Sequence, residues 1–426
     1  MSESIREAQW LLRAGRIEEA EQAYRRALTE NPFDPQALNI VALASIRMGQ
    51  LHHARELLER AVHAHPDHAT SHHHLGGVAE QLGDDAVAIA EYRRAIGLAG
   101  DGLPAARLHL ALLLEKTGAA RESLVEFARV MRDTQSKGKW LNAATTPPSL
   151  VTQVEHAARV VREGRHALLH DLVEPLAKEY GRSELVRVES MIANYLGERK
   201  VTPSDARQQP TFLYFPDLPT VPYFSSSLSP WVEALESQTS AIQGELEALL
   251  GIADSGERVF GSDAVEAQNL RGYRGAPTWT GHYLYRHGER RELNCRTSPV
   301  TAAALDDLPL CRVPAHGPEV LFSVFTSGTH LLPHRGVTNT RVVGHLPLVV
   351  PPDCALRVGG ENHVWQEGRV VVFDDTYEHE AWNRSDQVRV VLIFDLWNPY
   401  LTEVERLAVA KIVVAIGEFR AEMEAF

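Results

Sequence analysis

The 426-residue chain contains only three cysteines, Cys295, Cys311 and Cys354. They lie far apart and form no CxxC pair, which argues against both a disulfide framework and a cysteine zinc site. No stretch approaches the roughly 18 apolar residues that a membrane-spanning helix requires. The first residues are polar and lack the apolar core of a secretion signal. These absences predict a cytoplasmic protein.

Positive charge is also scarce, because 43 Lys and Arg residues face 56 Asp and Glu residues and the net charge is −13. A nucleic-acid-binding protein needs a basic face, and a polybasic membrane anchor needs clustered Lys and Arg. We therefore expect neither a nucleic acid nor a membrane as partner. The remaining composition, 44% hydrophobic and 23% charged, is typical of a globular protein, and the length predicts two or three domains.

The first third of the sequence repeats itself with a period of 34 residues. Glycines, alanines, large apolar residues and prolines recur in five separate registers, and a fourth, degraded unit follows after a one-residue slip. The pattern resembles the tetratricopeptide repeat, a helix-turn-helix unit of this length. The registers are Gly15, Gly49 and Gly83; Ala20, Ala54 and Ala88; Tyr24, Leu58 and Tyr92; Ala27, Ala61 and Ala95; Pro32 and Pro66; in the fourth unit, Gly118 and Phe127.

Such units bury their apolar faces only against their neighbours, so the array predicts a curved solenoid over residues 1–130. The resemblance implies a surface that binds a peptide or protein partner, and a dimerisation or scaffolding arm is the alternative. Residues 131–205 read as a helical connector. Three consecutive histidines at 72–74 do not predict a metal site, because consecutive residues point to different sides of a helix.

From about residue 206 the sequence changes to short segments rich in Val, Leu and Phe, punctuated by Gly, Pro and Asn. We expect one helix over 230–250, a closing helix over 402–423, and strands over 320–326, 341–350, 369–373 and 388–395. Many short strands predict a jelly roll, also called a double-stranded β-helix, over 206–426. The predicted fold class is therefore α+β multidomain, with an all-α solenoid before a jelly roll.

The chemical signal lies in the predicted jelly roll. His334 follows an early strand, His379 lies on a late one, and Arg389 comes ten residues after His379. Two His and one carboxylate on one face of Fe(II) are typical of non-haem iron enzymes, and an Arg can hold a cosubstrate carboxylate in bidentate fashion. The usual carboxylate position, two residues after the first His, holds Gly336 instead.

Three blocks make the resemblance specific: PHxG with TN, R and HL over 333–346, FDDxxEHExW over 373–382, and DLWNP over 395–399. They resemble the aspartyl/asparaginyl β-hydroxylase family of Fe(II)- and 2-oxoglutarate-dependent dioxygenases. That family lacks the carboxylate ligand and holds iron with two His alone. The resemblance covers about 210–405, and some family members also carry tetratricopeptide repeats. It implies Fe(II), 2-oxoglutarate and O2 as cofactor and cosubstrates.

The resemblance also implies roles for single residues. His334 and His379 would be the iron ligands and the catalytic centre. Ser323 and Arg389 match the positions that hold the C5 carboxylate of 2-oxoglutarate, and His345 matches a position near its C1 carboxylate.

One departure from the family pattern concerns the substrate side. Well-known members have an Arg where this chain has Val343. Arg341 shares a strand face with positions 343 and 345, so it is a candidate to supply the missing charge. Asp375 is a candidate for substrate contact or for orienting a ligating imidazole.

Three functions stay open at this point. The resemblance implies hydroxylation of the β-carbon of Asp or Asn in a peptide or protein that the repeats recruit. Val343 motivates the first alternative, the same chemistry on a free or carrier-bound amino acid or a lipid-like acid. The second alternative is a non-catalytic repeat scaffold. A structural zinc site is disfavoured because two His stand without a further His or Cys.

Overall fold

The computed structural model describes residues 3–225, 230–250, 256–259, 270–271 and 279–425. The chain divides into two compact units, one of residues 1–165 with 419–426 and one of residues 166–418. The division falls within a long helix of the segment that reads as a connector. Among the described helices, none combines the length and the apolar character that a membrane crossing would require.

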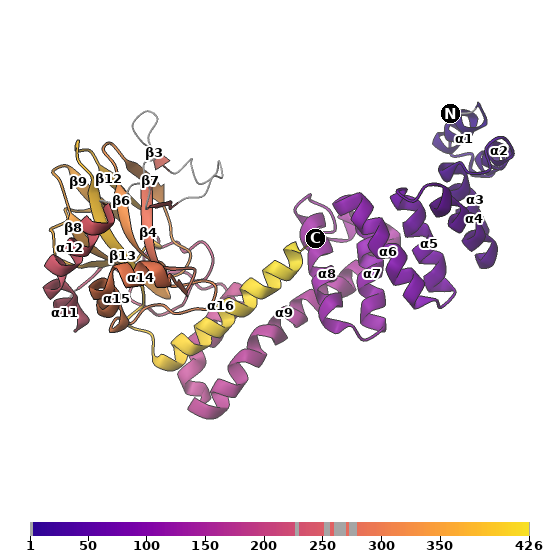
Figure 1. The fold of residues 1–426 in the computed structure, drawn as a ribbon. Coiled ribbons are helices and arrows are strands. Elements are labelled where there is room, and N and C mark those ends of the chain that lie inside the picture. The colour runs from indigo at the N-terminus through magenta and orange to yellow at the C-terminus, as the bar shows by residue number, and fades with distance from the viewer. Residues whose placement is uncertain (1–2, 226–229, 251–255, 260–269, 272–278, 426) are drawn as a thin grey trace. The chain divides into compact units, whose positions relative to one another are not determined.

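The first unit is built of antiparallel helix pairs that follow one another along the chain (Figure 1). The last pair is the degraded fourth unit, so the predicted helical repeat is confirmed. Its helices are α1 (Glu3–Arg13), α2 (Ile17–Glu30), α3 (Pro35–Arg47), α4 (Leu51–Ala64), α5 (Ala69–Gln81), α6 (Asp85–Ala99), α7 (Pro104–Lys116) and α8 (Ala120–Gln135), with the 3-10 turn η1 (Gly100–Gly102).

Small residues at fixed positions explain how these helices pack. The repeated alanines are fully buried, and the large residues of the neighbouring register, among them Tyr24 and Tyr92, fill the space between helices. Gly76 shows the requirement directly, because a Cβ there would lie 2.9 Å from the Tyr92 ring. Gly83 closes its helix pair with φ of 80°, a left-handed conformation that glycine adopts without strain.

The three consecutive histidines serve the packing of the repeats. His72 bonds to Glu91 at 2.6 Å and to the carbonyl of Pro66 at 2.9 Å. His74 bonds through Nδ1 to Oδ1 of Asn39 at 2.6 Å, and the His73 ring lies 5.9 Å from that of Tyr92. The three side chains thus have three different sets of contacts within the repeats.

The segment after the repeats is mostly helical. It comprises the 3-10 turns η2 (Ala143–Thr145), η3 (Pro148–Leu150) and η4 (Arg182–Leu185) and the helices α9 (Val151–Tyr180) and α10 (Val186–Tyr195). The last residues of α16 (Glu403–Glu424) belong to the first unit. There the buried Arg129 donates to the carbonyls of Met423 at 3.1 Å and Ala425 at 3.0 Å.

The second unit holds two antiparallel sheets. The larger sheet has the order β1-β11-β8-β13-β6-β4-β2 with β5 beside β4, and the smaller has the order β10-β9-β12-β7-β3. The strands are β1 (Tyr223–Phe224), β2 (Glu257–Arg258), β3 (Leu270–Arg271), β4 (Trp279–Arg286), β5 (Glu289–Arg290), β6 (Val320–Phe325), β7 (His330–His334), β8 (Arg341–Val349), β9 (Cys354–Val358), β10 (Glu361–His363), β11 (Val371–Phe373), β12 (His379–Asn383) and β13 (Arg389–Trp397).

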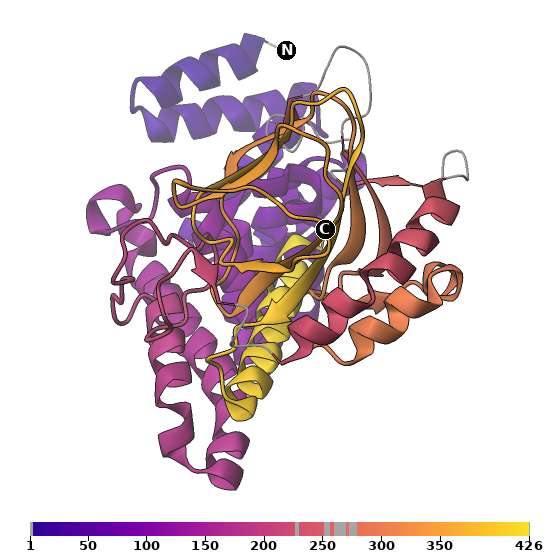
Figure 2. The ribbon, with the colours of Figure 1, turned by 90° about the vertical axis from the view of Figure 1, so that its left-hand side faces the viewer.

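Helices cover the outer face of the larger sheet, as the pink and orange helices of Figure 2 show. They are α11 (Trp231–Ser237), α12 (Thr239–Leu250), α14 (Glu292–Thr297) and α15 (Pro299–Asp306). The single helix expected over 230–250 is wrong in one respect, because the chain breaks it at Gln238 into α11 and α12. A second apolar cluster, which includes Phe325, Leu356 and Phe373, draws on both sheets. The predicted helical unit followed by an antiparallel β unit is thus confirmed.

Candidate functional site

The two histidines of the sequence motifs lie side by side on the smaller sheet. His334 ends β7 and His379 begins β12, and the two residues are direct partners in the antiparallel register. Their ring centroids are 4.0 Å apart and the rings are inclined by 51°. Both rings face the interior between the sheets, where they line one cavity. Two separate sequence motifs therefore meet at a single point.

Backbone carbonyls fix the orientation of both imidazoles. Nδ1 of His334 lies 2.8 Å from the carbonyl of Leu332, and Nδ1 of His379 lies 3.1 Å from that of Tyr377. A carbonyl only accepts, so each Nδ1 carries the proton and each Nε2 keeps a free lone pair. Burial lowers the pKa of both rings, that of His379 to about 3. Neutral imidazoles held by their second nitrogen are the form that a metal requires.

A carboxylate from elsewhere in the chain fills the space beside Gly336, the position where the usual third ligand is missing. A Cβ at Gly336 would lie 2.2 Å from Cγ of Asp375, so no side chain fits at position 336 while Asp375 stays in place. Oδ1 of Asp375 is buried without a hydrogen-bond partner, whereas Oδ2 accepts from Arg341 at 3.0 Å. Across the described residues, no three His, Cys, Asp or Glu side chains are placed to hold a metal together.

Arg341 does not stand free beside the predicted iron site. Its guanidinium donates to Asp375 at 3.0 Å and to Asp395 at 2.9 Å, so one cation lies between two carboxylates. Positions 341, 343 and 345 all line the cavity, as the strand alternation predicts. Sequence reasoning missed Asp395, although an acid in the apolar run of β13 was a signal, since a buried charge demands a partner.

Arg389 presents a buried cation with little to neutralise it. Its Nη1 donates to the carbonyl and to Oγ of Ser323, both at 3.3 Å, and its Nε has no partner. No described Asp or Glu forms an ion pair with it. Burial lowers the pKa of Arg389 to about 9, so the side chain is still charged at neutral pH. A buried and unpaired guanidinium is a site for an anion.

His345 lies close to Arg389 on the larger sheet. Its Nδ1 is buried without a partner, and its ring packs 5.0 Å from that of Phe373. Burial, and next the charge of Arg389, hold the pKa of His345 well below its usual range. A neutral imidazole with an unused nitrogen is available to a ligand.

One cavity of about 340 Å³ joins these groups. Six of the seven predicted site residues line it, whereas Asp375 does not line it and is bonded to Arg341, which does. Sequence reasoning missed Trp279, which lines the same cavity and donates from Nε1 to Oγ of Ser323 at 2.9 Å. The six predicted residues that line the cavity are Ser323, His334, Arg341, His345, His379 and Arg389.

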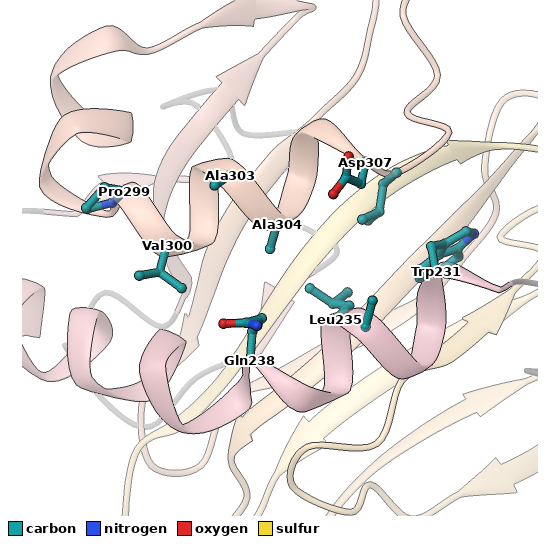
Figure 3. Close-up of a pocket in the computed structure, with 10 residues that line it drawn as sticks. Trp231, Leu235, Gln238, Pro299, Val300, Ala303, Ala304 and Asp307 are labelled. Carbon is teal, nitrogen blue, oxygen red and sulfur yellow. The ribbon is translucent and has the colours of Figure 1, made fainter.

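A larger cavity of about 510 Å³ lies between α11–α12 and α15, away from these residues (Figure 3). Its walls are mostly apolar, and Asp307 is the one ionisable side chain among those that line it. A single carboxylate beside Trp231, Leu235 and Ala304 offers neither a metal ligand set nor an acid–base pair. The smaller cavity, which is lined by both histidines and by Arg389, is therefore the candidate site.

Comparisons with known proteins agree with this geometry. The family model described as aspartyl/asparaginyl beta-hydroxylase matches residues 236–399, and the tetratricopeptide repeat model matches 5–47 and 42–102. "Aspartate beta-hydroxylase domain-containing protein 2" from Homo sapiens is 34% identical over 58% of this chain and 65% of its own length. The same protein from Mus musculus is 32% identical over 61% of this chain and 75% of its own length.

The name of a third relative gives a different kind of substrate. "Ornithine lipid ester-linked acyl 2-hydroxylase" from Rhizobium tropici is 34% identical over 44% of this chain and 64% of its own length. Among solved structures, the repeats are similar to YrrB, a TPR protein, with 23% identity over 30% of this chain and 66% of that one, and a TM-score of 0.28. The chain spans just under two thirds of the human relative. The matched segments and identities place this chain in the aspartyl/asparaginyl β-hydroxylase family.

Proposed function

We propose that this protein is an Fe(II)- and 2-oxoglutarate-dependent hydroxylase. The observation that carries the proposal is the pair of imidazoles, each held through Nδ1 by a carbonyl, in the same cavity as a buried Arg389 with no carboxylate partner among the described residues. The donor set fits the group: His334 and His379 offer free Nε2 atoms for Fe(II). Arg389, Ser323 and His345 offer the charge and hydrogen bonds for a dicarboxylate.

The bound iron and 2-oxoglutarate would supply the oxidising chemistry, in which O2 converts 2-oxoglutarate to succinate and CO2 and a C–H bond of the substrate becomes C–OH. The residues of this chain do the rest. Arg389 and Ser323 bind and orient the dicarboxylate, and the carbonyls of Leu332 and Tyr377 keep the imidazoles deprotonated at Nε2. Apolar walls, among them Val343 and Ile393, exclude water from the reacting carbon.

For the substrate, we propose the β-carbon of an Asp or Asn residue in a peptide or protein. The family name supports this substrate, and the repeats supply a surface suited to a peptide. A lipid-like or small acid is the second candidate. It is supported by Val343 where well-known members have Arg, by the engagement of Arg341 with two aspartates, and by the name of the Rhizobium relative.

The test is incubation of the full chain with Fe(II), 2-oxoglutarate and O2, in parallel with a library of Asp- and Asn-containing peptides and with ornithine lipids or free amino acids. Mass spectrometry reads the gain of one oxygen atom, and succinate is measured as the co-product. Oxygen gain in peptides supports the first substrate, and gain only in the small acids supports the second. Absence of succinate with every substrate would instead support the non-catalytic scaffold.

A further inference from the structure

Trp365 contacts residues of the predicted cosubstrate site, and the family motifs assign it no role. It lies in the connection between β10 and β11, where its neighbour Val364 is 70% exposed. Trp365 itself is only 3% exposed and belongs to the apolar cluster that draws on both sheets. The indole is therefore buried although it belongs to a connecting segment, so its contacts indicate its role.

The indole lies against Arg389. The guanidinium carbon of Arg389 is 4.7 Å from the Trp365 ring and 3.8 Å from the Phe325 ring. The cation is therefore stacked on two aromatic rings. The same indole lies 5.9 Å from the ring of His345, the other residue expected to meet the dicarboxylate.

Arg389 needs such support because its other contacts are weak. Its two hydrogen bonds to Ser323 are long, at 3.3 Å, and its Nε has no partner. An arginine side chain has many rotamers, so one that is not held must be ordered when its ligand binds, at a cost to affinity. Aromatic rings hold a guanidinium by cation–π attraction without using its N–H donors. The donors of Arg389 thus stay available to an anion.

The indole nitrogen gives an independent indication. Nε1 of Trp365 is buried and has no hydrogen-bond acceptor. Nε of Arg389 and Nδ1 of His345 are likewise buried without a hydrogen-bond partner. Buried polar atoms in native proteins nearly always have a partner, so unused donors and acceptors that gather in one place mark a site that folding alone does not complete.

We infer that Trp365 is a positioning residue for the cosubstrate, because it holds the guanidinium of Arg389 in the orientation that receives the distal carboxylate of 2-oxoglutarate. The inference rests on the proposed function. It assigns to Trp365 an effect on dicarboxylate affinity that acts through Arg389.

The experiment measures binding on the full chain. The protein is loaded with Mn(II), 2-oxoglutarate is titrated in the absence of O2, and calorimetry gives the Kd. Trp365→Leu should raise the Kd about tenfold, the size expected for a lost cation–π contact in a desolvated site. Trp365→Phe keeps an aromatic face and should stay within about threefold of the wild type. Trp382→Leu is the matched control, because Trp382 stacks on Arg384 and not on Arg389.

Thermal unfolding of each variant separates packing from positioning. If Trp365→Leu does not fold, Trp365→Met, a longer apolar side chain without an aromatic face, takes its place with the same expected Kd. A folded Leu or Met variant that binds 2-oxoglutarate as tightly as the wild type overturns the inference. So does a Phe variant that loses as much affinity as Leu. A wild-type protein that binds no 2-oxoglutarate refutes the proposed function itself.

Discussion

Buried polar side chains have different surroundings in the repeats and in the β unit. In the repeats, Arg107 pairs with Glu126 at 2.6 Å and both ring nitrogens of His72 have partners, while Nδ1 of His73 is an isolated buried atom without one. In the β unit, Nδ1 of His345 and Nε of Arg389 have no partner and their side chains line the same cavity. Desolvating a polar group without a hydrogen bond costs about 1–3 kcal/mol. Unpartnered atoms on side chains that share one cavity are the arrangement expected where a ligand completes the hydrogen bonds.

Removal of an imidazole at the predicted metal site should have the largest effect. His379→Ala takes away one of the two predicted ligands, so iron-dependent succinate formation should fall below detection while the thermal unfolding temperature stays close to that of the wild type. Succinate formation measures turnover, and circular dichroism measures the thermal unfolding temperature. His363→Ala is the control, since His363 lies on β10 outside the cavity, and it should keep full turnover. Normal turnover of His379→Ala would refute the ligand assignment.

Removal of the buried cation comes next. Arg389→Gln should weaken 2-oxoglutarate binding by about a hundredfold, since a charge-assisted contact in a desolvated site contributes on the order of 3 kcal/mol. Calorimetry on the Mn(II)-loaded chain checks this. The loss of stability should be small, because the lost stacking on Phe325 and Trp365 is offset by the lower cost of burying a neutral amide, and no described carboxylate is left without its partner. A large drop in unfolding temperature would mean that Arg389 is part of the fold, as Arg107 is in the repeats.

Addition of a carboxylate at position 336 should destabilise the β unit by about 3 kcal/mol. The reason is overpacking, since the new Cβ would lie 2.2 Å from Cγ of Asp375, and two acids would share one space. Differential scanning calorimetry of Gly336→Asp measures the loss. The double variant Gly336→Asp/Asp375→Ala frees the space and should recover most of it. Equal stability of Gly336→Asp and the wild type would show that Asp375 moves aside easily.

Acidification should affect the repeats by a smaller amount per residue. Burial lowers the pKa of His73 and of His74 from 6.5 to about 4. The unfolded chain therefore binds more protons between pH 6.5 and 4, so stability is full above pH 6.5 and falls as the pH drops through this window, by about 2 kcal/mol for each histidine between pH 7 and pH 5. Hydrogen exchange of α5 at pH 7 and pH 5, corrected for intrinsic rates, measures this loss of stability. His73→Phe should remove part of the effect, and an unchanged dependence would contradict it.

The sequence predicts the repeats and the pair of imidazoles well, for different physical reasons. A fixed period reports a fixed packing geometry, so Ala20, Tyr24 and their equivalents reveal the helix pairs directly. His334 and His379 were found because their surrounding motifs resemble a known family. Arg341 shows the limit, because its partners Asp375 and Asp395 come from other elements and only the folded sheet brings them together. Trp365 was missed because the sequence of a connecting segment does not indicate which of its side chains are buried.

The crowding of Gly336 by Asp375 has a consequence for how this kind of centre changes over generations. A single substitution at position 336 meets an occupied space, and a single substitution at position 375 leaves Arg341 with one partner fewer. A carboxylate at position 336 therefore needs a second change that clears the side chain of Asp375. In this chain the predicted two-histidine arrangement thus lies two substitutions, and not one, from a strain-free third carboxylate.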